Sequence, residues 1–596
     1  MNSERSGWLP SAWVAREQVS YDEVRAANGA LWWLQSDPDL GGARRLMRAG
    51  ITGVAESQTP PDASVGGYLH AYGGGSYAVA DSAVWFVRAE DSKIYRIEAG
   101  NGPELVVSSD DGYAYGDLWF SPAESLLAVR GDEAGDEIVE VSHGGLRVLV
   151  RSTGFLAAPR QRGGLLAYLE WGRDEMPWDA SRLRLAELGP RRAGTNRIVA
   201  GGEHESVVQP HWGPEGHLYF LSDRNGWWNL YRYADNQVEA VAPLDADCAA
   251  APWEGGYQSY VITASGEVVL TANDGIRTDL VAVGRDGQRR RCAANLSSVK
   301  PYLGVLGNSV AVIGSTPVSR PSVYLIDLAL DAGRSAHPIS PAEDRAPEWG
   351  VSPPTEQAVK SAEWDVRYLL HRPHDRGPVP LIVRAHPGPT DDVPLRLDWT
   401  IQFFVSRGYA VAEVAYRGST GQGRAFRQSL HGHWGEYDVD DCALVAEQLV
   451  ADGVGAPGAV FISGASAGGY TALQAACRPG PFTGATATSA IIDPARWRES
   501  VPAFQRPHAA ILAGPAGAVQ AGAVEAPLLL IHGTADEISS AGDAMQLADD
   551  LAALDHDHEV LLLDDGDHYL SAPEHLEQAL RVELAFYERL IRSAAC

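Results

Sequence analysis

The sequence predicts two unlike domains, an N-terminal seven-bladed β-propeller and a C-terminal α/β-hydrolase domain. Three observations indicate them. Strand–turn–strand units recur up to about residue 345, strands alternate with helices after about residue 350, and one later strand ends in Gly-x-Ser-x-Gly. A chain of 596 residues is also too long for a single core. We place an N-terminal segment at 1–17, the propeller at 18–347 and the hydrolase domain at 348–596.

The propeller is predicted from seven units at a spacing of about 40–50 residues, which is the period of a propeller blade. Two examples are DSAVWFVRAEDSKIYRIEAG and HWGPEGHLYFLSDRNGWWNLYRY. Their alternating apolar positions cannot be buried within one unit, so each unit must stack on its neighbours. A pair of β-sandwiches is the alternative, but the sustained count of units favours a propeller.

The hydrolase domain is predicted from a change of rhythm. PPTEQAVKSAEWDVRYLLHRP indicates a hairpin, and then strands such as PLLLIHG alternate with amphipathic helices such as YDVDDCALVAEQLVADG. This alternation over about 240 residues implies a parallel sheet with helices on both faces. In such sheets the reactive residues lie in loops after the carboxyl ends of the strands.

Three residues in such loops form a predicted catalytic triad. Ser466 lies in VFISGASAGGYTAL, between an apolar strand and a helix, as in a nucleophile elbow. Asp536 and His568 follow later strands, in PLLLIHGTADEI and EVLLLDDGDHYL, and the order Ser, Asp, His is that of α/β-hydrolases. The serine hydroxyl needs a base, histidine can supply it, and a carboxylate orients the imidazole. Taken singly, each residue could be a helix cap or a surface residue; together they favour a triad.

An oxyanion hole should accompany the triad. One backbone N–H is expected from Ala467, the residue after the nucleophile, and the other from Gly388 in RAHPGPT. A Pro-Gly turn without a catalytic role is the alternative at Gly388.

These motifs resemble the prolyl oligopeptidase family of serine peptidases, which joins a β-propeller to an α/β-hydrolase domain. HPGPT resembles the family's HGGPT, AYRGSTGQG its NYRGSTGYG, HWGEYDVDDC its WGxxDVxD and GASAGGY its GGSAGGY. In the propeller, HAYGGGSYAV and SDRNGWWNLYR resemble segments of the acylaminoacyl-peptidase and dipeptidyl-aminopeptidase branch. The resemblance covers nearly the whole chain. It implies hydrolysis of short peptides or aminoacyl amides at an enclosed site, without a metal or other cofactor.

Two departures from the family pattern bear on the substrate. Ala71 replaces a glutamate of the family's HEYGGG, and ADCAAAPW stands where a blade segment of the family resembles EFGxPxW. A third departure, Pro387 in place of a glycine of HGGPT, concerns the oxyanion loop. Acidic residues at the propeller face often bind a substrate amino group in this family, so the loss of one leaves the exopeptidase mode open. We expect an aminopeptidase-like enzyme. The alternatives are an acylaminoacyl-peptidase or oligopeptide endopeptidase, an amidase or esterase that removes an aminoacyl group from a small natural product, and a non-catalytic propeller that binds proteins.

Recognition of a free ammonium requires a carboxylate near Ser466 that lies outside the triad. Glu254 and Glu499 are the preferred candidates, because aromatic and apolar residues flank them. Trp497 and Phe504 are candidate apolar contacts of the substrate, with ordinary core packing as the alternative. The further carboxylate candidates are Asp247, Asp391 and Asp392.

Composition limits the partners. A net charge of −29 argues against nucleic acid and anionic membranes, which need basic surfaces. The sequence shows no apolar stretch of signal-peptide or membrane-helix length. Five scattered cysteines without a Cys-x-x-Cys spacing indicate free thiols in a reducing cytoplasm. The oligomeric state is left open.

Overall fold

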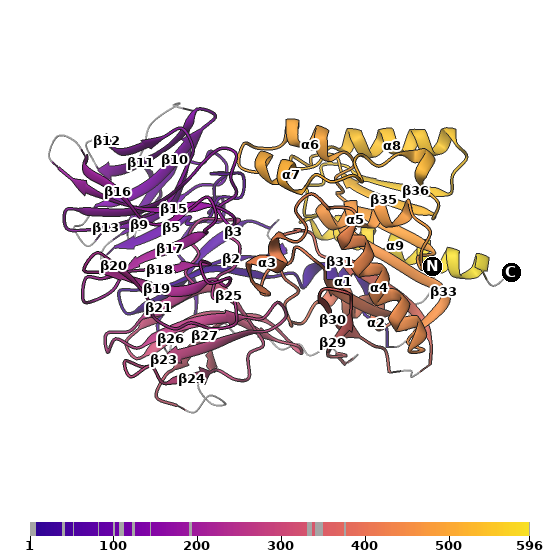
Figure 1. The fold of residues 1–596 in the computed structure, drawn as a ribbon, viewed down its shortest axis with the longest axis horizontal. Helices are drawn as coiled ribbons and strands as arrows, with labels where there is room; N and C mark the ends of the chain where they lie inside the picture. The colour runs from indigo at the N-terminus through magenta and orange to yellow at the C-terminus, as the bar shows by residue number, and fades with distance from the viewer. Residues whose placement is uncertain are drawn as a thin grey trace.

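A propeller and a hydrolase domain face each other in the computed structural model of the chain (Figure 1). The structure describes residues 7–38, 42–51, 53–80, 83–98, 102–106, 112–121, 125–142, 145–189, 193–330, 336–339, 350–374 and 377–594.

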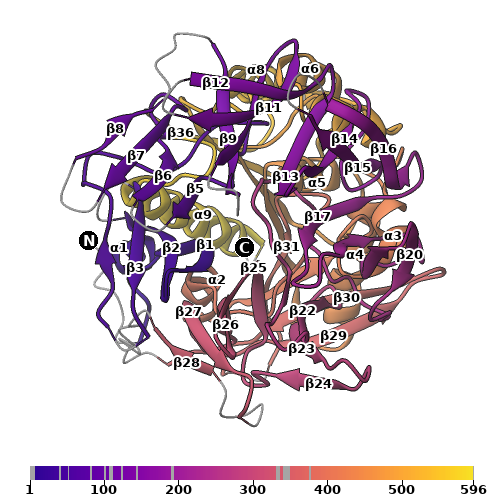
Figure 2. The same ribbon diagram turned by 90° about the vertical axis from the view of Figure 1, so that its left-hand side faces the viewer.

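The propeller consists of seven four-stranded antiparallel sheets, and the seven predicted blades are confirmed. Figure 2 shows them as a ring in front of the hydrolase domain. Their strands are β1 (Ser20–Ala27), β2 (Ala30–Ser36), β3 (Arg44–Ala49), β4 (Glu56–Ser57), β5 (Tyr77–Ala80), β6 (Ala83–Val87), β7 (Ile94–Glu98), β8 (Glu104–Leu105), β9 (Ala114–Phe120), β10 (Leu126–Asp132), β11 (Gly135–Ser142), β12 (Gly145–Ser152), β13 (Phe155–Arg162), β14 (Leu165–Trp171), β15 (Ser181–Leu188), β16 (Ala193–Gly202), β17 (Val207–Trp212), β18 (Leu218–Ser222), β19 (Asn229–Ala234), β20 (Gln237–Ala240), β21 (Tyr260–Ile262), β22 (Val268–Asn273), β23 (Thr278–Val283), β24 (Arg289–Cys292), β25 (Ser298–Leu306), β26 (Ser309–Thr316), β27 (Ser319–Asp327) and β28 (Ala336–Pro338).

The blades bury their apolar faces against one another. Leu183, Leu218 and Leu270, from three successive blades, lie in one buried cluster. The ring closes where Trp33 of the first blade packs with Ile313 of the last. Stacking between neighbours therefore supplies the core that a single blade lacks.

The hydrolase domain is built on one eight-stranded sheet in the order β29-β30-β32-β31-β33-β34-β35-β36. The predicted hairpin and the predicted parallel sheet that follows it are both confirmed. Strands β29 and β30 form the expected hairpin and join antiparallel, whereas β32 to β36 run parallel. The elements of this domain are β29 (Thr355–Lys360), β30 (Asp365–His371), β31 (Val379–Ala385), α2 (Trp399–Val405), β32 (Ala410–Ala415), α3 (Gly423–Gln428), α4 (Tyr437–Ala451), β33 (Gly455–Ala465), α5 (Ala467–Ala476), β34 (Gly484–Thr488), α6 (Pro494–Ser500), α7 (Arg506–Leu512), η2 (Ala521–Ala523), β35 (Leu528–Gly533), α8 (Ala541–Ala553), β36 (His558–Leu563) and α9 (Pro573–Ala594).

Helices cover both faces of this sheet. Apolar residues of α4, α5 and α8 share one buried cluster with the sheet, and those of α2 and α9 share another. The N-terminal helix α1 (Ser11–Arg16) joins the second cluster, where Trp13 lies edge-on to Trp399 with ring centroids 4.8 Å apart. The predicted segment 1–17 thus packs, in its described part, against the hydrolase domain. The predicted boundary at 347–348 lies outside the described residues.

A buried ion network, the interdomain joint, fixes the two domains together. Asp223, after β18, accepts hydrogen bonds from Arg424 and Arg427 of α3, each at 2.7 Å. Both Asp223 and Arg427 have fully buried side chains, and the Arg427 guanidinium lies 3.9 Å from the centre of the Trp228 ring. Burial raises the pKa of Asp223, and the two arginines oppose that rise. The joint therefore depends on the pairing of the buried Asp223 carboxylate with these two guanidinium groups.

Asp247 belongs to the same joint. Its carboxylate accepts the backbone N–H groups of Trp228, Gly421 and Gly423, at 2.9, 3.0 and 3.2 Å. It is fully buried and committed to these donors, so its prediction as a possible amine acceptor was wrong.

Two findings bear on the composition. Cys248, Cys292, Cys442 and Cys477 are free thiols, and Cys596 lies outside the described residues. None of the helices in the described part of the chain has an apolar stretch long enough to cross a bilayer.

We predict that Asp223→Asn lowers the free energy of unfolding by about 3–5 kcal/mol, because it removes the carboxylate that is hydrogen-bonded to the buried Arg427 cation. Urea denaturation followed by tryptophan fluorescence measures the change. Glu588→Gln, which removes an exposed partner of Arg592, is the control and should change stability by less than about 1 kcal/mol. Equal effects of the two substitutions would contradict a structural role for the joint.

Candidate active site

Ser466 lies in a strained turn between β33 and α5. Its backbone has φ 53° and ψ −118°, a left-handed conformation that is unusual for a residue with a side chain. The surrounding glycines permit this turn. A Cβ on Gly464 would lie 2.1 Å from the carbonyl oxygen of Gly468, and one on Gly468 would lie 2.4 Å from that of Ala385. The sequence around Ser466 therefore folds as a nucleophile elbow.

Asp536 and His568 meet beyond the ends of β35 and β36. The Asp536 carboxylate lies 2.8 Å from Nδ1 of His568, with side chains 0% and 8% exposed. Burial would raise the pKa of Asp536, but hydrogen bonds from His532 and His568 hold it well below its ordinary value. Asp536 is therefore ionised at neutral pH and can orient the imidazole.

Two residues that support Asp536 were missed by the sequence analysis. Ser539 donates its N–H and its hydroxyl to the carboxylate, at 2.9 and 2.8 Å. His532, near the end of β35, lies 3.3 Å from the same carboxylate. Their positions within PLLLIHGTADEISS are the only signal that could have indicated them, since each serves Asp536 rather than the reacting atoms.

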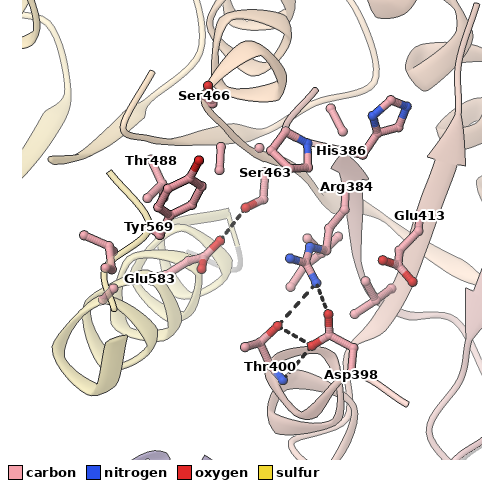
Figure 3. Close-up of a pocket in the computed structure, with 18 of the residues that line it drawn as sticks. Arg384, His386, Asp398, Thr400, Glu413, Ser463, Ser466, Thr488, Tyr569 and Glu583 are labelled. Atoms are coloured by element: carbon pink, nitrogen blue, oxygen red, sulfur yellow. Dashed lines mark hydrogen bonds and ion pairs between the residues drawn. The ribbon is translucent and has the colours of Figure 1, made fainter. Parts of the chain in front are cut away.

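A cavity of about 470 Å³ contains both Ser466 and His568 in its wall. Figure 3 shows Ser466 on one side of it and the ion pair of Arg384 with Asp398 on another, at 3.7 Å. Through its hydrogen bond to His568, Asp536 stands just behind the wall. The structure thus brings the three predicted triad residues to one edge of the sheet, beside an internal space. Within the described residues, no group of three or more histidine, cysteine or acidic side chains is arranged to hold a metal ion.

The two predicted oxyanion donors are not directed at a common empty point. The N–H of Ala467 donates to the carbonyl oxygen of Pro387, at 3.1 Å. The preceding residue is held firmly: the His386 ring is stacked 4.0 Å from the Tyr416 ring, and its Nε2 lies 2.8 Å from the Ser419 hydroxyl. Gly388 nevertheless lies in the predicted strand–loop, directly beside the elbow.

Two of the predicted substrate contacts lie elsewhere. Trp497 is 7% exposed, packs in the hydrolase core and donates its indole N–H to the carbonyl of Ile538, at 3.0 Å. Glu499 is exposed on α6 and does not line the cavity that holds Ser466. Their predicted substrate contacts are therefore not supported, because α6 turns one side to the core and the other to solvent.

Phe504 joins the domains instead of lining the catalytic cavity. It is 2% exposed and inserts from the hydrolase domain into an aromatic cluster of the propeller. Its ring is stacked on His70 at 5.7 Å and lies edge-on to Trp178 at 6.2 Å. With Glu254 it lines a smaller space of about 40 Å³ between the domains. The alternative of packing, at an interdomain contact, is the better description of this residue.

Glu254 faces the interior between the domains. Its loop packs on the glycine run of AYGGGS: a Cβ on Gly74 would meet the Gly255 carbonyl oxygen at 2.4 Å. Burial, reinforced by the charge of Asp22, raises the pKa of Glu254 to about 7. Desolvation and then the charge of Glu254 raise the pKa of Tyr569, which is 66% exposed and lies beside His568 in the wall of the cavity.

Asp391 and Asp392 line the cavity directly, together with Ser466. Burial, with the charge of Asp392, raises the pKa of Asp391 to about 7. Burial raises the pKa of Tyr257, and the charges of Glu254 and Asp391 both raise it further. Carboxylates from the two domains therefore act on the same small region.

The elbow, the carboxylate–histidine pair and the enclosing ring define a propeller-capped α/β-hydrolase. Residues 395–594 match the model of the prolyl oligopeptidase family. A dipeptidyl aminopeptidase BIII of Pseudoxanthomonas mexicana is 34% identical over 147 residues, which cover 23% of this chain and 21% of that protein. An acylamino-acid-releasing enzyme of Arabidopsis thaliana is 28% identical over 190 residues, which cover 28% and 25%. The chain's matches thus span about a quarter or less of the length of these curated relatives.

Solved structures extend the similarity to both domains. A puromycin-hydrolyzing peptidase of Mycobacterium tuberculosis is 26% identical, with a TM-score of 0.92, and the alignment covers 98% of this chain and 97% of that one. The hydrolase region of the chain therefore matches the prolyl oligopeptidase family, and the whole chain shares the fold of this solved structure. The expected two-domain architecture is confirmed, and the family match over residues 395–594 supports the expectation of a serine peptidase.

We predict that Ser466→Ala lowers kcat by about a million-fold while leaving the melting temperature unchanged, because it removes only the nucleophilic oxygen. Hydrolysis of an aminoacyl p-nitroanilide measures the loss. Ser593→Ala, on the exposed end of α9, is the matched control and should retain full activity. Residual activity within tenfold of wild type would exclude Ser466 as the nucleophile.

Proposed function

We propose that this protein is an aminopeptidase-like serine hydrolase that acts on short peptides or aminoacyl amides with a free amino group. The observation that supports this most is the pair of carboxylates Glu254 and Asp391, one from each domain, near the cavity of Ser466. Among the described residues, neither makes an ion pair with an arginine, lysine or histidine. Glu254 accepts a hydrogen bond from the Tyr302 hydroxyl, at 3.4 Å.

These carboxylates suit a cationic ligand. Burial outweighs the nearby positive charges of Arg44 and Lys300 at Glu254 and of Arg396 at Asp391, and it raises the pKa of both carboxyls to about 7. A substrate ammonium placed between them would add a positive charge close to both carboxyls and favour their ionised forms. The amino end of the substrate would thereby be held at a fixed distance from Ser466.

The reaction then follows from the triad. The Ser466 oxygen attacks the acyl carbon as its proton passes to His568, which later gives that proton to the leaving amine. Asp536 holds the imidazole and stabilises its cationic form. Water, activated by His568, attacks the acyl-enzyme and releases the free amino acid or short acyl product.

A second substrate class is an aminoacyl group on a small natural product. The similarity over nearly the whole chain to a puromycin-hydrolyzing peptidase favours it. Puromycin is an aminoacyl amide with a free amino group, so the same carboxylates would recognise it. Cleavage of N-acylated substrates, as the name of the Arabidopsis relative implies for that protein, would need no such carboxylates.

We predict that N-acetylation of the substrate lowers kcat/KM by about tenfold or more, because one lost charge contact is worth at least about 1.4 kcal/mol. The preference for the free amine, expressed as the ratio of the two kcat/KM values, should rise as pH increases from 5.5 to 7. Over that range Glu254 and Asp391 ionise, while the substrate amine stays protonated, with a pKa of about 7.7–8.0. Taking the ratio cancels any pH dependence that the cleavage of the two substrates has in common.

Glu254→Gln and Asp391→Asn should each reduce this preference and flatten its pH dependence, whereas Glu499→Gln on exposed α6 should leave both unchanged. Equal or faster cleavage of acetylated substrates would favour an acylaminoacyl-peptidase or endopeptidase. Failure of Ser466 to react with a fluorophosphonate would favour a non-catalytic binding protein.

A further inference from the structure

The hydrogen bond between the Ala467 N–H and the Pro387 carbonyl, at 3.1 Å, occupies the donor that the reaction requires. When Ser466 attacks, the substrate carbonyl becomes an oxyanion, and backbone N–H groups must donate to it at about 2.7–3.1 Å. An oxyanion and the Pro387 carbonyl cannot both accept in that place. The donor after the nucleophile is therefore blocked in the substrate-free protein.

The same hydrogen bond also fixes the direction of the second predicted donor, the Gly388 N–H. A trans peptide is planar, and its C=O and N–H point in opposite directions. Because the carbonyl of Pro387 points at Ala467, the N–H of Gly388, in the same peptide unit, points away. Pro387 has no N–H of its own. One peptide orientation thus removes both predicted oxyanion donors.

We propose that the free enzyme holds its oxyanion hole closed in this way, and that rotation of the Pro387–Gly388 peptide opens it when substrate binds; this inference rests on the function proposed above. Type I and type II turns are related by the same rotation of a central peptide. Rotation withdraws the Pro387 carbonyl from Ala467 and turns the Gly388 N–H toward it. Both N–H groups then point at the oxyanion.

Gly388 is the residue that permits the rotation. In the closed arrangement its φ lies outside the left-handed region, so an alanine there would not be strained by its backbone. An added Cβ would lie 3.2 Å from Cβ of Asp391, a tight contact that a small shift relieves. After rotation φ becomes positive, as at the third position of a type II turn, which favours glycine strongly. Alanine should therefore suit the closed arrangement and oppose the open one.

The flanking residues are held, so that only one peptide is free to turn. On one side the Tyr416 hydroxyl donates to the carbonyl of His386, at 3.0 Å. On the other side Trp253 of the propeller donates its indole N–H to the carbonyl of Thr390, at 2.9 Å. Trp253 immediately precedes Glu254, so the propeller residue that holds the loop adjoins the proposed amine site. Trp253 is in this sense a positioning residue for the oxyanion loop.

The first experiment compares Gly388→Ala with Gly377→Ala, a control glycine with open space around its Cβ position. Gly388→Ala should lower kcat for an aminoacyl p-nitroanilide by about 100-fold or more, with KM within threefold and the melting temperature unchanged. The Ki of the matching aminoacyl aldehyde, which forms an oxyanion on Ser466, should rise by a similar factor. Retained activity would overturn the inference. So would a loss of activity accompanied by a large fall in melting temperature, because the glycine would then be required in the free state.

The second experiment compares Trp253→Phe with Trp178→Phe. Their rings are neighbours, with centroids 4.4 Å apart, but the indole N–H of Trp178 is buried without a hydrogen-bond partner. Trp253→Phe should lower kcat about tenfold with little change in KM, and Trp178→Phe should leave both unchanged. Equal effects of the two would assign Trp253 to packing alone and overturn its positioning role.

A structure of the aldehyde adduct tests the rotation directly. The inference requires the N–H groups of Ala467 and Gly388 on the hemiacetal oxygen, and it is overturned if the Pro387 carbonyl still accepts from Ala467. If no aminoacyl substrate is cleaved, the proposed function fails. The rate of fluorophosphonate labelling of Ser466 then replaces kcat as the readout for Gly388→Ala, so the two failures remain distinguishable.

Discussion

The buried carboxylate of Asp223, held between Arg424 and Arg427, is the interaction on which the enclosed site depends. Charges of this kind cost much to bury and contribute little net stability when fully paired. Their geometry is nevertheless exacting, because both acceptors of the Arg427 guanidinium, the Asp223 carboxylate and the Trp178 carbonyl, lie in the propeller. The joint therefore selects one orientation of the propeller. That orientation places Glu254 and Trp253, both from the propeller, beside the hydrolase loop that carries Asp391 and Gly388.

The interdomain joint also explains the role of two segments that resemble the family but hold no catalytic residue. SDRNGWW supplies Asp223 and Trp228, and AYRGSTGQGR supplies Arg424 together with the backbone N–H groups that bind Asp247. Glycine at 423 is needed there, because a Cβ would lie 2.8 Å from the carbonyl oxygen of Gly226. These segments are the two halves of one contact. The elbow thus serves the chemistry, and the interdomain joint, which other parts of the chain form, serves the enclosure of the site.

Sequence reasoning succeeded where the determining forces are local. Strand periodicity gave the seven blades, and the steric limits around Ser466 gave the elbow. It failed where a residue's role is set by a distant segment: Asp247 binds a loop that lies more than 170 positions away, and Phe504 packs into a propeller cluster. A single sequence carries no signal of such pairings. The orientation of the Pro387–Gly388 peptide was equally unreadable, since Pro-Gly accommodates both arrangements.

The packing of α1 on the hydrolase domain means that the propeller is, in its course along the chain, an insertion into that domain. The apolar residues Leu9, Trp13 and Val14 stay uncovered until α2 and α9 have been synthesised and pack on them. At about 5–20 residues per second, the ribosome reaches α9 roughly half a minute to two minutes after it has made α1. During biosynthesis the completed propeller therefore carries an uncovered hydrophobic helix at its leading end. Chaperone binding to a nascent chain should concentrate there, and the final helix should release it.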